Sequence, residues 1–63
     1  MQISLKSARV NKGLTQADVG LAIGVTPKTV GSWEQGKTMP NSKKINPLCE
    51  LLGVKYDDIR WNV

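Results

Sequence analysis

The 63-residue sequence contains no histidine and no phenylalanine, and its single cysteine is Cys49. Histidine is the usual general base of enzymes and the commonest protein ligand of metal ions, so its absence argues against both roles. One cysteine forms neither an internal disulfide bond nor a zinc site. We therefore expect a protein that is not an enzyme and that needs neither a cofactor nor a metal.

Long apolar segments are also missing. The longest uninterrupted apolar run is only a few residues long, whereas about 20 residues are needed to span a bilayer. The first ten residues, MQISLKSARV, lack the apolar block of a secretory signal peptide. The sequence thus predicts a cytoplasmic protein with no membrane partner.

Hydrophobic residues make up 40% of the chain and charged residues 22%, proportions that are typical of a globular domain. A domain of this length buries only about 60% of its unfolded surface, so nearly every element must contribute to the core. Aromatic residues are 5% of the chain, and the core should therefore be mainly aliphatic. Residues 1–63 are expected to form a single domain.

Positive charge is in excess and is unevenly distributed. Nine lysines and arginines stand against five acidic residues, which gives a net charge of +4. Residues 1–44 carry seven basic and two acidic side chains, whereas residues 45–63 carry two basic and three acidic ones. A basic body with a mildly acidic tail favours a polyanionic partner such as nucleic acid.

Several glycines lie where helices should end. Glycine is favoured there because it adopts the left-handed conformation at a helix C-terminus without a steric clash. Four of them serve this purpose: Gly13, Gly24, Gly36 and Gly53. The helices predicted between them cover residues 3–12, 16–23, 27–35 and 47–52, followed by a last turn near 56–61. Residues 37–45 are expected to form an extended basic loop, and no strand is expected. The predicted class is all-α.

Capping residues fix the starts of the two central helices. Thr15 is suited to the N-cap position, with Asp18 completing a capping box, and Thr26 is followed by a proline at the first helical position. The apolar stripe of the first of these helices should consist of Val19, Ala22 and Ile23. The last helix is expected to start at Pro47 with Asn46 as its cap, since a proline inside a helix removes a hydrogen bond.

Residues 16–35 have the pattern of a helix-turn-helix, whose second helix enters the major groove of DNA. Gly20 allows the two helices to approach, Gly24 makes the turn and Val25 fills the corner beneath it. Val30 and Trp33 should anchor the second helix in the core. Cys49 is expected to be a buried, inert thiol rather than a redox sensor.

The sequence resembles the Cro and phage-repressor type of helix-turn-helix proteins, the XRE family, over about residues 5–54. The matching residues are Leu5, Arg9, Gly13-Leu14-Thr15-Gln16, Val19, Ala22, Gly24-Val25-Thr26, Thr29-Val30, Trp33-Glu34, Gly36-Lys37, Pro40, Leu48 and Leu52-Gly53-Val54. The resemblance implies a compact five-helix, lambda-repressor-like domain that binds operator DNA as a homodimer and regulates transcription. Such a protein would be cytoplasmic and associated with the nucleoid.

Two positions depart from the family pattern. Gly31 lies inside the recognition helix, where a side chain is more usual, and we expect it to let the backbone lie close to DNA. Pro47 lies where the fourth helix of the family runs, which predicts a shorter helix here.

The first turn of the recognition helix should read base edges, and the residues around it should hold the backbone. The candidates for base contact are Thr26, Pro27, Lys28, Thr29 and Ser32, with Lys28 suited to guanine and Pro27 to a thymine methyl group. Thr29 is expected to contact either a base edge or a phosphate. The alternative is that Lys28 and Ser32 belong to a solvated face.

Phosphate contacts are expected at the start of residues 16–23 and in the segment that follows the recognition helix. The candidates are Gln16, Gln35, Lys37, Thr38, Ser42, Lys43 and Lys44. Gln16 would hold a phosphate together with the helix N-terminus, or would be a surface glutamine without a partner. For Lys43 and Lys44, contact with DNA and a solvated charge without a partner are equally compatible with the sequence.

Arg9 and Glu34 are charged residues on core-facing sides of their helices, and we interpret them as structural. The resemblance implies that they form a partly buried ion pair. Dimer contacts are expected at Ile59, Trp61 and Val63, although Trp61 fits equally well as a cover for its own core. Two copies would bind half-sites about 34 Å apart.

Two kinds of function are compatible with this sequence. The first is sequence-specific binding of double-stranded DNA by a phage or bacterial regulator, either a minimal Cro-like protein or the DNA-binding part of a longer repressor. The alternative is an interaction module with the same fold, such as an antitoxin or an adaptor. Salt-sensitive DNA binding separates the two.

Overall fold

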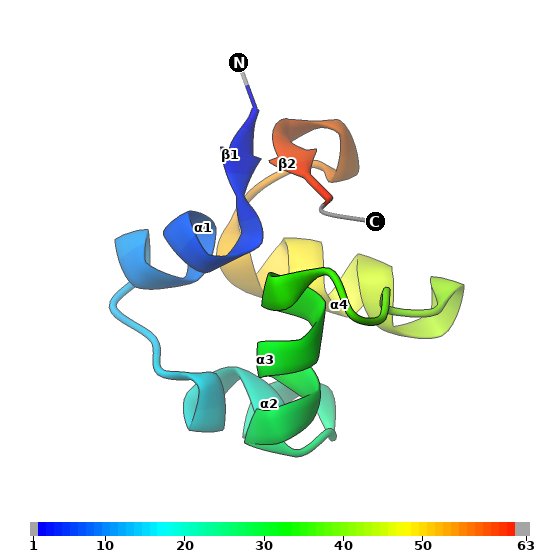
Figure 1. The fold of residues 1–63 in the computed structure, drawn as a ribbon. Helices are drawn as coiled ribbons and strands as arrows, with labels where there is room; N and C mark the ends of the chain where they lie inside the picture. The colour runs from blue at the N-terminus through cyan, green and yellow to red at the C-terminus, as the bar shows by residue number, and fades with distance from the viewer. Residues whose placement is uncertain (1, 62–63) are drawn as a thin grey trace.

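The structure, a computed structural model, describes residues 2–61. A short strand precedes four α-helices, and a 3-10 turn and a second short strand follow them (Figure 1). The elements are β1 (Ile3–Ser4), α1 (Leu5–Asn11), α2 (Gln16–Ile23), α3 (Pro27–Gln35), α4 (Ser42–Leu52), η1 (Tyr56–Asp58) and β2 (Ile59–Arg60). The helical class is confirmed, but the five-helix count is not, because the last expected helix is only η1.

The caps predicted for α2 and α3 are confirmed. The hydroxyl of Thr15 accepts from the backbone N–H of Asp18 at 3.0 Å, and the Asp18 carboxylate accepts from the N–H of Thr15 at 2.9 Å. The hydroxyl of Thr26 caps α3 in the same way by accepting from the N–H of Thr29. These bonds satisfy donors that the first turn of a helix leaves unpaired, so local sequence fixes where both helices begin.

The first helix is shorter than predicted, and the expectation that no strand would form is wrong. Ser4 caps α1, and Ile3 and Ser4 pair in parallel with Ile59 and Arg60. Figure 1 shows β1 and β2 side by side at one end of the molecule. The paired residues are far apart in the sequence and no short turn connects them, so no turn motif indicates the pairing. It places Ile59, 1% exposed, in the core.

The last α-helix is longer than predicted and contains Pro47. It begins at Ser42 because the side-chain oxygen of Asn41 accepts from the N–H groups of Lys43 and Lys44, at 3.0 and 3.1 Å. Pro47 costs the helix one backbone hydrogen bond. Burial of Leu48, Cys49 and Leu52 on the core side of α4 offsets that cost. Residues 42–45 are therefore helical rather than part of a loop.

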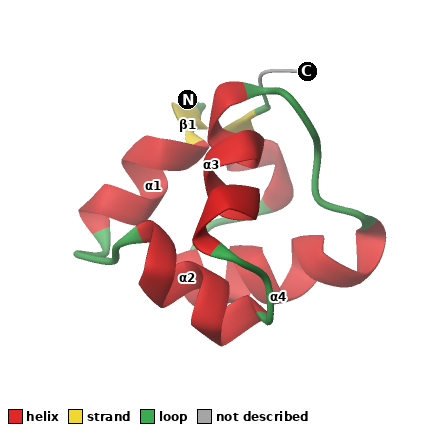
Figure 2. Ribbon diagram, turned by 60° about the horizontal axis from the view of Figure 1, so that its bottom comes forward, coloured by secondary structure: helices red, strands yellow, loops and turns green. Residues whose placement is uncertain are grey.

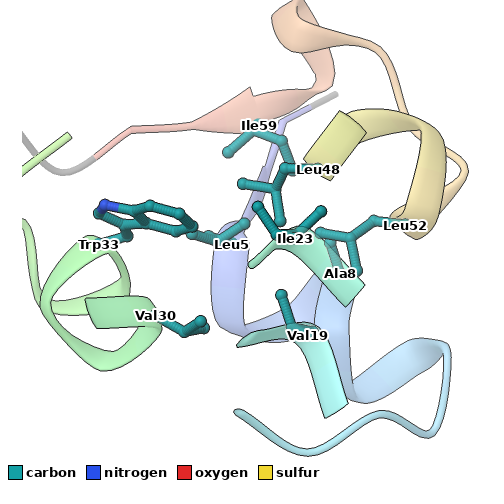
Figure 3. Packing of buried hydrophobic residues seen from close by; sticks show 9 residues of the cluster. All are labelled: Leu5, Ala8, Val19, Ile23, Val30, Trp33, Leu48, Leu52 and Ile59. Atoms are coloured by element: carbon teal, nitrogen blue, oxygen red, sulfur yellow. The ribbon is translucent and has the colours of Figure 1, made fainter. Parts of the chain in front are cut away.

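Each α-helix and the strand β2 contribute to a single core (Figure 3). Trp33 is 6% exposed and is a core residue, as predicted. In α2, Val19 and Ile23 are buried as predicted, but the prediction for Ala22 is wrong: it is exposed, and Gly20 is buried in its place. The core residues are Leu5, Ala8, Val19, Ile23, Val30, Trp33, Leu48, Leu52 and Ile59.

Cys49 is buried at the edge of this core, and the desolvation raises the pKa of its thiol. The predicted burial is confirmed, and a raised pKa disfavours the reactive thiolate form. Within residues 2–61, no helix is long and apolar enough to cross a membrane. The same part of the chain holds no group of three potential metal ligands.

Candidate nucleic-acid interface

Helices α2 and α3 and the turn between them form the helix-turn-helix. A Cβ atom at Gly20 would lie 2.5 Å from the carbonyl oxygen of Val25, so a side chain there would collide with the backbone of the turn. Gly24 ends α2 with φ of 87°, a conformation that favours glycine. Val25 is half-buried against the core beneath the turn. The two glycines and Val25 thus have the roles predicted for them.

Helix α3 lies at the front of the molecule in Figure 2, with α1 to its left and α2 below it. Its anchors, Val30 and Trp33, point into the core, so the opposite side of the helix faces outward. Of the base-contact candidates, three are exposed at its start: Thr26, Pro27 and Lys28. Thr29 and Ser32 are half-buried.

The two threonine hydroxyls at the start of α3 already have partners. The hydroxyl oxygens of Thr26 and Thr29 lie 2.9 Å apart, and that of Thr26 also caps the helix. Lys28 is the one charged side chain among the five base-contact candidates, and it is exposed. Of these five residues, Lys28 thus presents an exposed charged donor and Pro27 an exposed apolar surface.

Most of the phosphate candidates lie in one stretch, from the end of α3 to the first turn of α4. Gln35, Lys37, Thr38, Ser42 and Lys43 are all exposed. Figure 2 shows the loop between α3 and α4 leaving the end of α3 and running down to the start of α4. The exposed lysines Lys37 and Lys43 therefore lie at the two ends of this connection.

Lys44 has a different environment. It is half-buried, and its Nζ atom donates to the carbonyl oxygen of Ile23, the last residue of α2, at 3.2 Å. A cation at this position also interacts favourably with the negative end of the helix dipole. Lys44 thus joins α4 to the turn of the helix-turn-helix. The amino-acid sequence alone does not indicate this role of Lys44, because the role depends on how α4 crosses α2.

Arg9 and Glu34 form an ion pair between α1 and α3. The Nε atom of Arg9 lies 2.6 Å from Oε2 of Glu34, and the two side chains are 12% and 5% exposed. A second nitrogen of Arg9 donates to the carbonyl oxygen of Leu14 at 2.7 Å. The pair therefore connects α1 with both α3 and the segment that leads into α2.

Gln16, the first residue of α2, is part of the same network. Its Nε2 atom donates to Oε1 of Glu34 at 3.1 Å, and the residue is half-buried. The alternative of a surface glutamine without a partner is therefore wrong. The sequence contained both residues but no indication that they would meet, since they are 18 positions apart.

The three dimer candidates have different positions. Ile59 is wrong as a candidate, because it is buried in the core of its own domain. Trp61 is half-buried against that core, and its ring centroid lies 5.5 Å from that of Tyr56. Val63 lies outside the described residues. The packing of Trp61 agrees with its interpretation as a cover for its own domain.

Comparison with known proteins gives consistent matches. A helix-turn-helix family model matches residues 5–59. The chain is 30% identical over 61 residues to YgzD of Bacillus subtilis, described as an uncharacterized HTH-type transcriptional regulator, and the match covers 97% of this chain and 92% of YgzD. It is 36% identical over 53 residues to YonR, a regulator of the same description derived from the SPbeta prophage, covering 84% of this chain and 49% of YonR.

A eukaryotic relative is also similar. The chain is 35% identical over 52 residues to Multiprotein-bridging factor 1 of the yeast Debaryomyces hansenii, covering 82% of this chain. It spans only about a third of that relative, 35%, and about half of YonR. No solved structure matches the chain at a significant level. The fold and the extent of the family match together show that the chain belongs to the Cro and phage-repressor type of helix-turn-helix proteins, the XRE family.

Proposed function

We propose that the protein binds double-stranded DNA sequence-specifically and regulates transcription. The observation that carries this proposal is the exposed outer side of α3, held by a buried Val30 and Trp33 and followed by an exposed basic loop. In helix-turn-helix proteins the corresponding helix lies in the major groove. The names of the bacterial relatives, which describe transcriptional regulators, support the same function.

In this proposal, different residues of the surface contact the bases and the phosphates. Lys28 donates to the O6 and N7 atoms of a guanine, and Pro27 packs on a thymine methyl group, while Ser32 adds a weaker polar contact one turn later. Thr26 and Thr29 mainly stabilise the first turn of α3, because their hydroxyl groups are hydrogen-bonded to each other. Gln16, Gln35, Lys37, Thr38, Ser42 and Lys43 contact phosphates and set the position of the helix.

We infer further that the protein acts as a homodimer on an operator with two half-sites, in the manner of a phage repressor or a Cro-like regulator. One α3 helix covers only a few base pairs, and two copies spaced about 34 Å apart present two helices to one side of the duplex. With Ile59 buried, Trp61 and Val63 remain the candidates for contact between subunits. Such a small contact gives weak association in the absence of DNA.

A second candidate is a protein-interaction module, an adaptor or an antitoxin. The name of the yeast relative describes a bridging factor. In addition, Leu21 is 88% exposed on α2, an unusual position for a large apolar side chain. If the protein were such a module, a partner would cover Leu21 and DNA binding would be weak even at low salt.

The dependence of DNA binding on salt tests the proposal against this alternative. The experiment titrates a fluorescent random-sequence duplex with the protein from 50 to 300 mM KCl. Lys37 and Lys43 of two subunits make about four cationic contacts to phosphates per dimer, which predict a log–log slope near −3.6. Replacing Lys37 by alanine in each subunit should make the slope shallower by about 2, whereas Leu21→Ala should leave it unchanged. Absence of binding at 50 mM KCl would refute the DNA-binding function.

A further inference from the structure

Gly31 occupies the middle of α3, but it does not provide an approach for DNA. It is buried, and an added Cβ would lie 3.3, 3.6 and 3.7 Å from Nε2, Oε1 and Cδ of Gln16. All three atoms belong to one carboxamide, and its nitrogen and oxygen lie nearer to the glycine than its carbon does, so the end of the Gln16 side chain is directed at Gly31. The expectation that Gly31 lets the backbone contact DNA is therefore wrong: the space beside it is occupied by Gln16.

The carboxamide of Gln16 is held on a second side by Glu34. A carboxylate oxygen accepts hydrogen bonds, so it is the amide nitrogen of Gln16 that must face Glu34, at 3.1 Å. Glu34 is itself fixed by Arg9 and is 5% exposed on its side chain. Gln16 thus loses much of its side-chain freedom when the protein folds, and binding a ligand no longer has to immobilise it.

Gln16 is also the first residue of α2. The hydroxyl of Thr15 accepts from the backbone N–H of Asp18. The other backbone N–H groups in the first turn of α2 have no partner within the helix. The amide nitrogen of Gln16 has two hydrogens, and the bond to Glu34 uses one of them. The second hydrogen and the N–H groups at the start of α2 are donors of the kind that a phosphate accepts.

We propose that Gly31 is a positioning residue for DNA binding: it makes the room in which Glu34 holds the Gln16 carboxamide ready for a backbone phosphate. This inference rests on the proposed function and names the residue that sets the geometry of one contact. A methyl group at position 31 has to push the flexible end of Gln16 by a few tenths of an ångström. The backbone of α3 need not move, and alanine is a better helix former than glycine.

Four proteins test the inference: the wild type, Gly31→Ala, Gln16→Ala and the double variant. Binding is measured on two duplexes of unrelated sequence, and thermal unfolding is recorded for each protein. Gly31→Ala should weaken binding about tenfold per subunit on both duplexes, the size of one lost hydrogen bond to a charged group in each subunit, with an unfolding temperature equal to or above that of the wild type. In the Gln16→Ala background, the change at position 31 should have no further effect on binding.

A spectroscopic measurement follows the position of Gln16 directly. The two side-chain amide protons of Gln16 should shift in NMR spectra of Gly31→Ala without DNA, while the signals of core methyl groups stay in place. Wild-type affinity in Gly31→Ala, an unchanged Gln16 amide signal, or a tenfold loss that persists without Gln16 would each overturn the inference. A wild type that binds neither duplex would instead refute the proposed function, so the two failures can be distinguished.

Discussion

The Nζ atom of Lys44, in the first turn of α4, donates a hydrogen bond to the carbonyl oxygen of Ile23 at the end of α2, over 3.2 Å. Its neighbour Lys43 is exposed and lies in the same turn. Two adjacent lysines therefore have different environments. One of them holds the turn of the helix-turn-helix against α4, and the other remains available to a phosphate.

Because of this difference, the same substitution at the two lysines should affect two different properties of the protein. Lys44→Met should lower the free energy of unfolding by about 1 kcal/mol, the usual size of such a bond, which corresponds to about 4–8 °C in a domain of this size. Lys43→Met should leave stability unchanged but make the salt dependence of DNA binding shallower by about 1 per subunit. Thermal unfolding and DNA titration of both variants measure these effects. The interpretation would be wrong if Lys43→Met were the destabilised variant.

The ion pair between Arg9 and Glu34 predicts a large loss of stability. Arg9→Ala leaves a buried carboxylate without its cation, and the expected cost is about 3–5 kcal/mol. Lys6→Ala, an exposed change on the same helix, should cost almost nothing. Urea denaturation compares the two. An Arg9→Ala protein with wild-type stability but without DNA binding would contradict the structural role.

The capping box at the start of α2 predicts a pH dependence. The backbone N–H and the hydroxyl of Thr15 hold the pKa of the Asp18 carboxyl below its ordinary value of 3.8. Because the folded protein then binds this proton less readily than the unfolded chain, the stabilisation is present above pH 3.8 and is lost as the pH falls through the lower folded value. Unfolding temperatures between pH 6 and pH 2.5 should therefore fall more in the wild type than in Asp18→Asn. Equal falls would show that ionisation of Asp18 contributes nothing to the pH dependence of stability.

Local chemistry was enough to predict the centre of the fold. Thr15, Thr26 and Pro27 specify where α2 and α3 begin, and Gly24 and Gly36 specify where they end, through bonds within a few residues. The helix-turn-helix and its core anchors follow from these short-range signals and from apolar spacing.

The features that the sequence did not reveal depend on distant contacts. The pairing of Ile3 with Ile59 joins the two ends of the described chain, and a two-residue strand has no periodicity of its own. Pro47 does not break α4, because the Asn41 cap and the burial of Leu48 outweigh one lost hydrogen bond. The site shows the same limit, since the positions of Gln16 and Lys44 depend on helices that cross only in the folded protein.

The most direct test of the account is selection of bound duplexes from a random DNA pool, with the wild type and with Lys28→Ala in parallel. The wild type should enrich two half-sites separated by about one turn of the duplex, with guanine at one fixed position in each. Lys28→Ala should enrich the same spacing but lose the preference at that position. Enrichment of no sequence by the wild type, or an unchanged guanine preference in Lys28→Ala, would contradict the claim that α3 reads the major groove through Lys28.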